Sequence, residues 1–276
     1  MIELPEATII AQQIAAELAG KQIEYGDRGN AVHKFAFANG TADEYAAIVK
    51  DKTVGAAVGH GSAILVPIEP GHVLVLGGGG ERILYHSAGA TLPKKTHLMI
   101  RFTDGSCLTV TVQGWGNTLL LPAETYAEHR HVQFDRVPPL SEGFTWPFFE
   151  SLFDEVDPES SISIKFFLIS EPGVWGIGNG CLQDILYRAR IHARRSMVDI
   201  RDDEKCVLYD AIVDTLSQMV EQGGRYEERD LYGERGGYVR LLDSKTKGTP
   251  CTVCGTPIEK SQYLGGAIYY CPTCQT

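Results

Sequence analysis

Four cysteines near the end of the chain have the spacing of a metal site. Two residues separate Cys251 from Cys254 and Cys271 from Cys274, and sixteen residues lie between the two pairs. Each C-x2-C turn points two sulfurs inward, and the intervening stretch has the length of a hairpin that returns the second pair to the first. The pattern predicts one structural Zn²⁺ held by four thiolates, with no open position for an activated water. Disulfides are the alternative, which a reducing compartment disfavours.

A second group of side chains is basic. The sequence YRARIHARR at residues 187–195 contains Arg188, Arg190, Arg194 and Arg195 and no acid. The formal net charge of −10 works against nucleic-acid binding, because Lys and Arg supply most of the non-specific affinity. Residues 135–159 carry seven acids and one base and would repel a duplex. The basic segment is therefore a candidate nucleic-acid contact in an acidic protein, and a solvated helix face is the alternative.

The first part of the chain is predicted to be a helix followed by a β domain. After Pro5, apolar residues recur with helical spacing as far as Leu18, and Gly20 supplies a stop. Residues 21–121 contain short runs rich in Val, Ile and Leu that are separated by glycine turns, as in a β-sandwich or barrel. The GGGG run at residues 77–80 is interpreted as a flexible hairpin tip rather than a phosphate loop, because strands are predicted on both sides of it.

The second part is predicted to be mostly helical. Residues 122–145 are polar and include Pro138-Pro139, which indicates a linker, and helical periodicity then continues to a glycine stop at Gly223. We expect an α+β protein with a helix and β-sandwich domain at residues 1–125, a helical domain at residues 140–224 and a zinc hairpin at residues 245–276. A length of 276 residues, of which 43% are hydrophobic, suffices for such cores.

No stretch reaches the roughly 18 consecutive apolar residues of a membrane span. The first twenty residues contain Glu3, Glu6 and Glu17 and no basic leader, so they do not resemble a signal peptide. A cytoplasmic location without membrane partners is expected.

The motifs and their order resemble the formamidopyrimidine-DNA glycosylase and endonuclease VIII family. They are an N-terminal ELPE, a β domain, a helical domain and a terminal YYCPTCQ. GIGNG followed by LQDILYRARIH is similar to the helix-two-turn-helix element of that family, with its asparagine matched by Asn179, and GTPCTVCGTPI is similar to the opening of its zinc finger. The resemblance covers essentially the whole chain, and it implies that fold, one zinc ion and DNA as the partner.

The resemblance also implies a mechanism. In the family, the second encoded residue is a proline whose secondary amine attacks the sugar of a damaged nucleotide, so that base removal and strand cleavage share one covalent intermediate. The next residue, a glutamate matched by Glu3, handles protons at the opening sugar ring. The asparagine matched by Asn179 and an arginine of the zinc finger clamp the phosphates beside the flipped nucleotide.

This chain departs from that pattern at the nucleophile. Ile2 stands in place of the proline. Initiator methionine is normally removed only before small residues, so Met1 is expected to remain and the nitrogen of Ile2 to be an unreactive amide. For Glu3 and Glu6 the structural alternative is capping of the first helical turn, which contributes roughly 0.3 to 1 kcal/mol each.

Other departures fall on residues that would touch DNA. The phosphate-binding lysine of the family matches Ser62, and the zinc-finger arginine matches Gly266. Of the side chains that fill the gap in the base stack, one falls near Gly89 and the other two match Gly114 and Trp115, of which only Trp115 can still stack or wedge. The residues around the lesion have thus become small or inert, while the glycines, the asparagine and the cysteines of the scaffold remain.

The favoured interpretation is a zinc-containing, nucleic-acid-binding protein with the DNA-glycosylase fold, of the base excision repair type, that lacks the proline-dependent glycosylase and AP lyase chemistry. The residues expected to bind nucleic acid are Asn179, Arg188, Arg194, Arg195 and Trp115. One alternative is an active glycosylase in which the Met1 amine forms a Schiff base or Glu3 activates a water. Another is a non-catalytic protein-interaction module whose acidic surface binds a basic partner.

Overall fold

The computed structural model describes residues 1–31 and 34–276 and divides into two compact units. The first unit combines Met1–Arg136 with the later segment Gln222–Gly237, and the second combines Val137–Glu221 with Tyr238–Thr276. The α+β fold class is confirmed. The helical domain and the cysteine hairpin that were expected as separate domains both fall in the second unit, and a short segment that follows the last helix belongs to the first.

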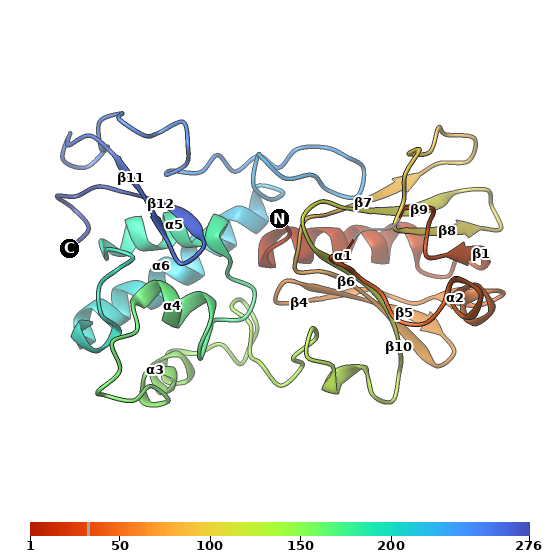
Figure 1. Cartoon of the computed structure of the whole chain (residues 1–276), viewed down its shortest axis with the longest axis horizontal. Coiled ribbons are helices and arrows are strands. Elements are labelled where there is room, and N and C mark those ends of the chain that lie inside the picture. Colours follow the sequence, from red (N-terminus) through yellow and green to blue (C-terminus); the bar gives the residue numbers. More distant parts are fainter. Residues whose placement is uncertain (32–33) are drawn as a thin grey trace. The chain divides into compact units, whose positions relative to one another are not determined.

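The first unit is built around helix α1, Leu4–Leu18, which lies between two sheets (Figure 1). Pro5 stands in its first turn, and its apolar positions Ile10, Ile14 and Leu18 are buried. The predicted helix is therefore present. It contributes to one core together with strands of both sheets, and each buried Ile or Leu side chain stabilises the fold by about 1.5 to 3 kcal/mol.

The two sheets form the predicted β-sandwich. The smaller has the strand order β1-β8-β9-β7 and the larger the order β2-β10-β6-β5-β3, with β4 paired to β5. The four strands of the smaller sheet are β1 Ile23–Asp27, β7 Glu81–His86, β8 Leu98–Phe102 and β9 Cys107–Val112. Those of the larger sheet are β2 Ala36–Phe37, β3 Thr53–Val54, β4 Val58–His60, β5 Ala63–Glu69, β6 His72–Gly77 and β10 Gly116–Pro122.

The GGGG run is not a hairpin tip, because β6 and β7 lie in different sheets. The run carries the chain from one sheet to the other, and Gly77 and Gly78 adopt φ values of +88° and +81°, which favour glycine. A Cβ at Gly79 would lie 2.3 Å from the Trp115 carbonyl oxygen, and one at Gly80 would lie 1.9 Å from the Gln113 carbonyl oxygen. Glycine is required here by close backbone packing and not by flexibility.

One helix of the first unit was not expected. Helix α2, Ala42–Val49, lies within the stretch predicted to contain only strands. Its capping box is formed by Thr41 and Glu44, a signal that the sequence TADE already carries. The segment predicted as a polar linker, residues 122–145, is partly ordered and partly buried. It contains the 3-10 helix η1, Tyr126–Glu128, and the side chains of Val132 and Phe144 are buried.

The second unit is mostly helical, as predicted. Its helices are α3 Trp146–Asp154, α4 Ile164–Ile169, α5 Asn179–Ala189, α6 Asp202–Glu221 and the 3-10 helix η2 Met197–Asp199. The hairpin of β11, Glu259–Tyr263, and β12, Gly266–Tyr270, completes this unit (Figure 1). Among the helices of the described residues, none has the length and apolar character to span a bilayer.

Candidate functional site

Ile2 is part of the hydrophobic core of the first unit. Its side chain is 3% exposed, and its backbone nitrogen donates a hydrogen bond of 2.6 Å to the carbonyl oxygen of Gly79. The glycine-rich run between the sheets therefore holds the backbone at position 2. The backbone amide nitrogen of a core residue, which already donates to a carbonyl group, is poorly placed to attack a bound molecule.

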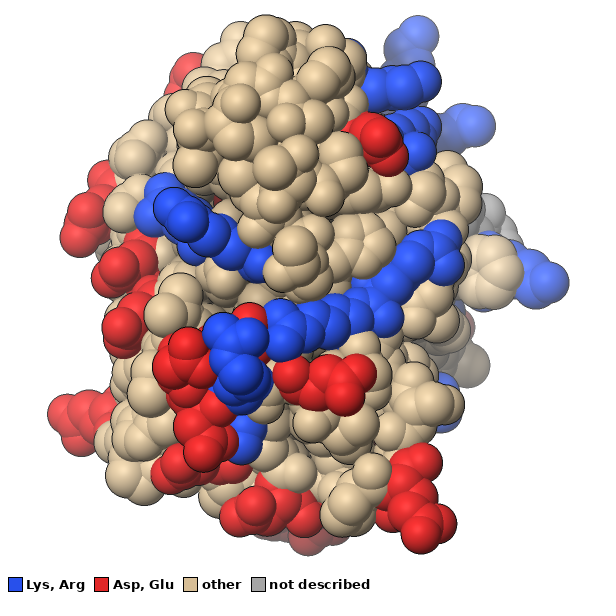
Figure 2. All heavy atoms as spheres, turned by 90° about the vertical axis from the view of Figure 1, so that its left-hand side faces the viewer, with Lys and Arg blue, Asp and Glu red and all other residues tan. Residues whose placement is uncertain are grey.

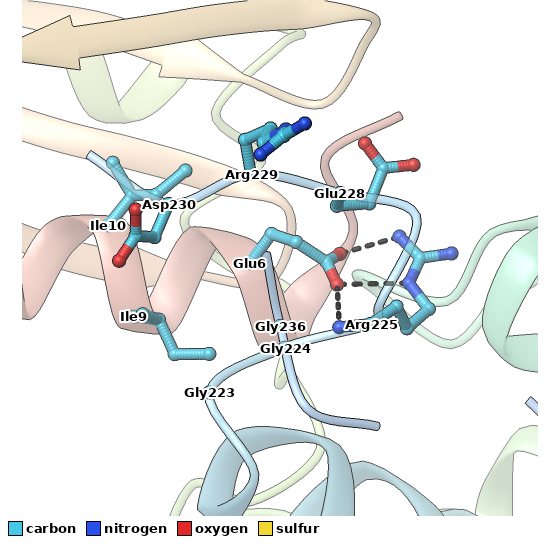
Figure 3. A pocket seen from close by; sticks show the side chains of 10 residues that line it. All are labelled: Glu6, Ile9, Ile10, Gly223, Gly224, Arg225, Glu228, Arg229, Asp230 and Gly236. Carbon is cyan, nitrogen blue, oxygen red and sulfur yellow. Dashed lines mark hydrogen bonds and ion pairs between the residues drawn. The ribbon is translucent and has the colours of Figure 1, made fainter. Parts of the chain in front are cut away.

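Glu3 and Glu6 face a buried arginine that the sequence did not single out. Arg225 Nη1 lies 2.9 Å from Glu3 Oε1, while Arg225 Nε and Nη2 lie 2.9 and 2.5 Å from the two carboxylate oxygens of Glu6. Figure 3 shows the Glu6 and Arg225 side chains directed at one another, with the Arg225 backbone nitrogen also donating to Glu6. Arg225 Nη2 further donates to the Met1 carbonyl oxygen at 2.7 Å.

These contacts decide the environment of the two carboxylates. Glu3, Glu6 and Arg225 are each 3% exposed or less, so water does not screen the ion pairs. Glu6 also accepts a hydrogen bond of 3.1 Å from the Glu3 backbone nitrogen, as in a capping box. Glu3 and Glu6 thus cap the first turn of α1, which was the structural alternative to a catalytic role. Arg225, more than 200 residues away in sequence, adds a positive charge beside them.

A pocket of about 260 Å³ lies beside the Met1 amino group. The ammonium is 2.5 Å from Glu228 Oε1, and Met1 is 43% exposed. The residues that line the pocket are Met1, Gly80, Glu81, Arg82, Gln113, Trp115 and Glu228. Trp115, predicted to stack on DNA, therefore lies at the same pocket as the amine. The pocket brings together a primary amine, two carboxylates and an aromatic ring.

Glu81 is a buried titratable group that no local pattern in the sequence indicates. Its carboxylate is 7% exposed and accepts hydrogen bonds from the backbone nitrogens of Gly79, at 2.9 Å, and Asn117, at 2.6 Å. Burial raises the pKa of Glu81 to about 7, although these hydrogen bonds act in the opposite direction. A carboxyl group that titrates near neutral pH is suited to proton transfer, and it lines the pocket at Met1.

In the second unit, Asn179 joins the start of α5 to the β11–β12 hairpin. Its Nδ2 donates to the Ala267 carbonyl oxygen at 3.1 Å, and its Oδ1 accepts a hydrogen bond of 2.9 Å from Lys165 Nζ. Lys165 also donates to the Tyr263 carbonyl oxygen at 2.9 Å. Burial lowers the pKa of Lys165, and the nearby positive charge of Arg194 lowers it further.

The arginines of the basic segment have different partners. Arg195 forms a bidentate pair with Glu204 at 2.6 and 2.7 Å, and Arg188 donates to Gln218 Oε1 at 2.7 Å. Arg194 is exposed, and its guanidinium carbon lies 4.2 Å from the centroid of the Tyr263 ring. On the face of the second unit seen in Figure 2, Lys and Arg side chains lie near Asp and Glu side chains and do not form a uniformly basic surface.

The four cysteine sulfurs converge as the spacing predicted. All four Sγ atoms lie within 4.8 Å of one another, with 3.9 Å between Cys251 and Cys274 and 3.4 Å between Cys254 and Cys271. A tetrahedral site with bonds of about 2.3 Å places its sulfurs roughly 3.8 Å apart, so the cluster has the size of a four-thiolate metal site. Among residues 1–31 and 34–276, these four cysteines are the group of His, Cys, Asp or Glu side chains whose ligand atoms lie close enough together to hold a metal ion.

Comparison with known proteins decides the family. A formamidopyrimidine-DNA glycosylase of Halalkalibacterium halodurans is 30% identical over 281 residues, which cover 100% of both chains. One from Cytobacillus firmus is 33% identical over 190 residues, or 67% of each chain. The chain belongs to the formamidopyrimidine-DNA glycosylase family. The family resemblance inferred from the motifs is thereby confirmed, although no protein-family model matches the chain.

The fold of this family member also agrees with solved structures. Lactococcus lactis Fpg in a complex with DNA that contains an abasic site has a TM-score of 0.84 to this chain, with 20% identity over 99% of both chains. The complex of the same protein with N7-benzyl-Fapy-dG DNA has a TM-score of 0.86 at 20% identity. At this identity the likeness establishes the architecture, while the side chains at the N-terminal site are those described above.

Proposed function

We propose that this member of the formamidopyrimidine-DNA glycosylase family binds DNA through the family fold but does not carry out proline-dependent glycosylase and AP lyase chemistry. The observation that carries the proposal is Ile2, which has no ring nitrogen, is buried in the core and donates its backbone N–H to Gly79. The solved Lactococcus lactis relatives in complex with damaged DNA support DNA as the partner. A cytoplasmic location, which keeps thiols reduced, is part of the proposal.

The environment of Glu3 supports the loss of chemistry. A proton-transfer group must reach the reacting atoms, yet the Glu3 carboxylate is 2% exposed and bonded to Arg225 Nη1 at 2.9 Å. The paired guanidinium stabilises the ionised carboxylate and fixes its orientation. Glu3 therefore acts as a structural partner of Arg225 in this proposal, and not as an acid or base.

We assign Zn²⁺ to the four cysteines. The sulfur separations suit tetrahedral coordination, and four thiolates leave no position for a reactive water. Bound zinc would hold the two ends of the β11–β12 hairpin together beside α5. In this role the metal shapes a DNA-binding surface and takes no part in bond cleavage.

Borohydride trapping on an oligonucleotide duplex with an abasic site tests the proposal. We expect fluorescence anisotropy to detect binding, and we expect neither a covalent adduct nor strand nicking in the same samples. The intact mass of the protein from its native cell reports the N-terminal residue in parallel. Nicking at the rate of an active family member run beside it would refute the proposal.

Ile2→Pro gives a second test. The substitution supplies a ring nitrogen, but it leaves the Glu3 carboxylate hydrogen-bonded to Arg225, and while Met1 is retained it also removes the hydrogen bond to Gly79. We expect no lyase activity from Ile2→Pro, even where mass spectrometry shows that Met1 has been removed. Recovered activity would mean that the pocket still supports the chemistry.

A second candidate function is a lyase that uses the Met1 amine. It is favoured by one observation, the position of this amine at the 260 Å³ pocket beside Glu228 and Glu81. A primary amine can form a Schiff base with the aldehyde of an abasic site. Peptide mapping of a trapped adduct to Met1, and its loss after N-terminal acetylation, would establish this function over the first.

A further inference from the structure

Lys165 is a buried cation with neutral partners. Its side chain is 0% exposed and donates to the Asn179 side-chain oxygen and the Tyr263 carbonyl oxygen, each at 2.9 Å. Within the described parts of the chain, no carboxylate forms an ion pair with it. Buried charges in proteins are normally compensated by a charge of opposite sign. The positive charge of Lys165 is therefore not compensated by an ion pair, and it favours an anion bound at the neighbouring surface.

Arg194 adds a second cation at the same turn. The Lys165 backbone nitrogen donates to the Ala193 carbonyl oxygen at 3.3 Å, which ties the loop after α5 to the start of α4. Arg194 extends from this loop over the Tyr263 ring and donates from Nη2 to the Gln262 carbonyl oxygen at 2.7 Å. A guanidinium has five N–H donors, so most of them can still bind a ligand. Stacking on Tyr263 holds the group in a defined orientation.

The β11–β12 hairpin beneath Arg194 has no cation where the family resemblance places a phosphate-binding arginine. Gly266 stands at that position, and a Cβ there would lie 3.3 Å from the Asn179 amide group. The hairpin turn is thus close to Asn179, and its residues Leu264, Gly265 and Gly266 carry no charge. An exposed guanidinium at this turn comes from a different element, since Arg194 lies in the loop that follows α5.

We propose that Arg194 binds a DNA backbone phosphate at the β11–β12 turn and so replaces the arginine absent at Gly266. Lys165 is a positioning residue, which supplies buried positive charge behind the turn and orients the Asn179 amide. The N-terminus of α5, at Asn179, adds the positive end of a helix dipole to the same site. The inference rests on the proposed DNA binding and names the side chain that replaces the lost contact.

The salt dependence of DNA binding tests this assignment. The probe is a fluorescein-labelled duplex with an abasic-site analogue, titrated with the full chain at several salt concentrations. Each phosphate contact adds about 0.9 to the slope of log K against log salt, so Arg194→Ala should lower that slope by about 1 and weaken binding about tenfold. Arg201→Ala is the matched control, because Arg201 is exposed on the same unit and already paired with Asp203. It should leave the slope unchanged.

A rescue experiment separates a phosphate contact from general loss of charge. Gly266→Arg returns a guanidinium to the hairpin, so the double variant Arg194→Ala/Gly266→Arg should regain the slope and most of the affinity. Circular dichroism checks that each variant is folded. If the wild type binds DNA and Arg194→Ala has the same salt slope, the assignment of Arg194 is wrong. The same holds if the double variant binds as weakly as Arg194→Ala. Either result leaves the proposed DNA binding itself intact. A wild-type protein that binds no DNA would overturn the proposed function as well.

Discussion

At the scale of single residues, Arg225 determines what two carboxylates can do. It is 3% exposed and compensates both Glu3 and Glu6, so its removal leaves buried negative charge without a partner. Arg225→Ala should therefore lower the free energy of unfolding by about 3 to 5 kcal/mol, measured by urea denaturation. Arg235→Ala, an exposed change on the same segment, should cost less than about 1 kcal/mol. Equal losses in both variants would contradict the ion-pair argument.

Glu81 gives a pH-dependent prediction at the same scale. Its folded pKa of about 7 lies above the ordinary 4.5, so the folded state binds more protons than the unfolded state between these values, and stability falls as pH rises through this window. The full effect is of the order of 3 kcal/mol. Glu81→Gln mimics the protonated form, so wild type should lose stability relative to the variant between pH 5 and pH 8. If the difference between the urea midpoints of wild type and Glu81→Gln stays constant across this pH range, the pKa of Glu81 is not raised.

The stability of the β11–β12 hairpin depends on the contacts made by the two C-x2-C turns at its ends. Each strand has five residues, and an isolated two-stranded hairpin is marginally stable in water. Neighbouring contacts help, since the Tyr187 hydroxyl lies 3.1 Å from Cys251 Sγ and Gln275 Nε2 donates to the Ile191 carbonyl oxygen at 3.1 Å. A metal that joins the two C-x2-C turns would supply the remaining stabilisation.

Metal removal tests this dependence. Elemental analysis should find one zinc per chain, and Cys274→Ser should reduce that content and raise the sensitivity of the hairpin to protease. Chelation of the wild-type metal should also weaken DNA binding, because the turn near Arg194 and Asn179 would lose its support. Cys206→Ser, a change at an exposed cysteine outside the cluster, should retain the metal. A metal-free wild type with full protease resistance would contradict this role.

The first unit is completed by a segment from late in the chain. Gln222–Gly237 delivers Arg225 to Glu3 and Glu6, and it places Leu231 in the core with 0% exposure. A fragment of Met1–Arg136 alone should melt at a lower temperature than the same fragment fused to Gln222–Gly237 through a glycine-serine linker. Circular dichroism measures both. Identical melting temperatures would show that the late segment adds no stability.

Patterns local in sequence determined much of this protein. Cysteine spacing predicted the metal cluster, apolar periodicity predicted α1 and the helical second unit, and the motifs around Asn179 predicted the family. These features can be predicted from the sequence because the C-x2-C turn, the helical repeat and the glycine turn each depend on residues close together in the chain.

Which side chains meet depends on how segments distant in the sequence pack together. Arg225 reaches Glu3 across 222 positions, Lys165 reaches the Tyr263 carbonyl across 98, and the GGGG run joins two sheets where a hairpin was expected. Glu81 titrates near neutral pH because folding removes it from water, which its sequence neighbours do not reveal. Burial and long-range ion pairs arise only when distant segments pack, so they fix the role of each carboxylate and arginine after the fold has formed.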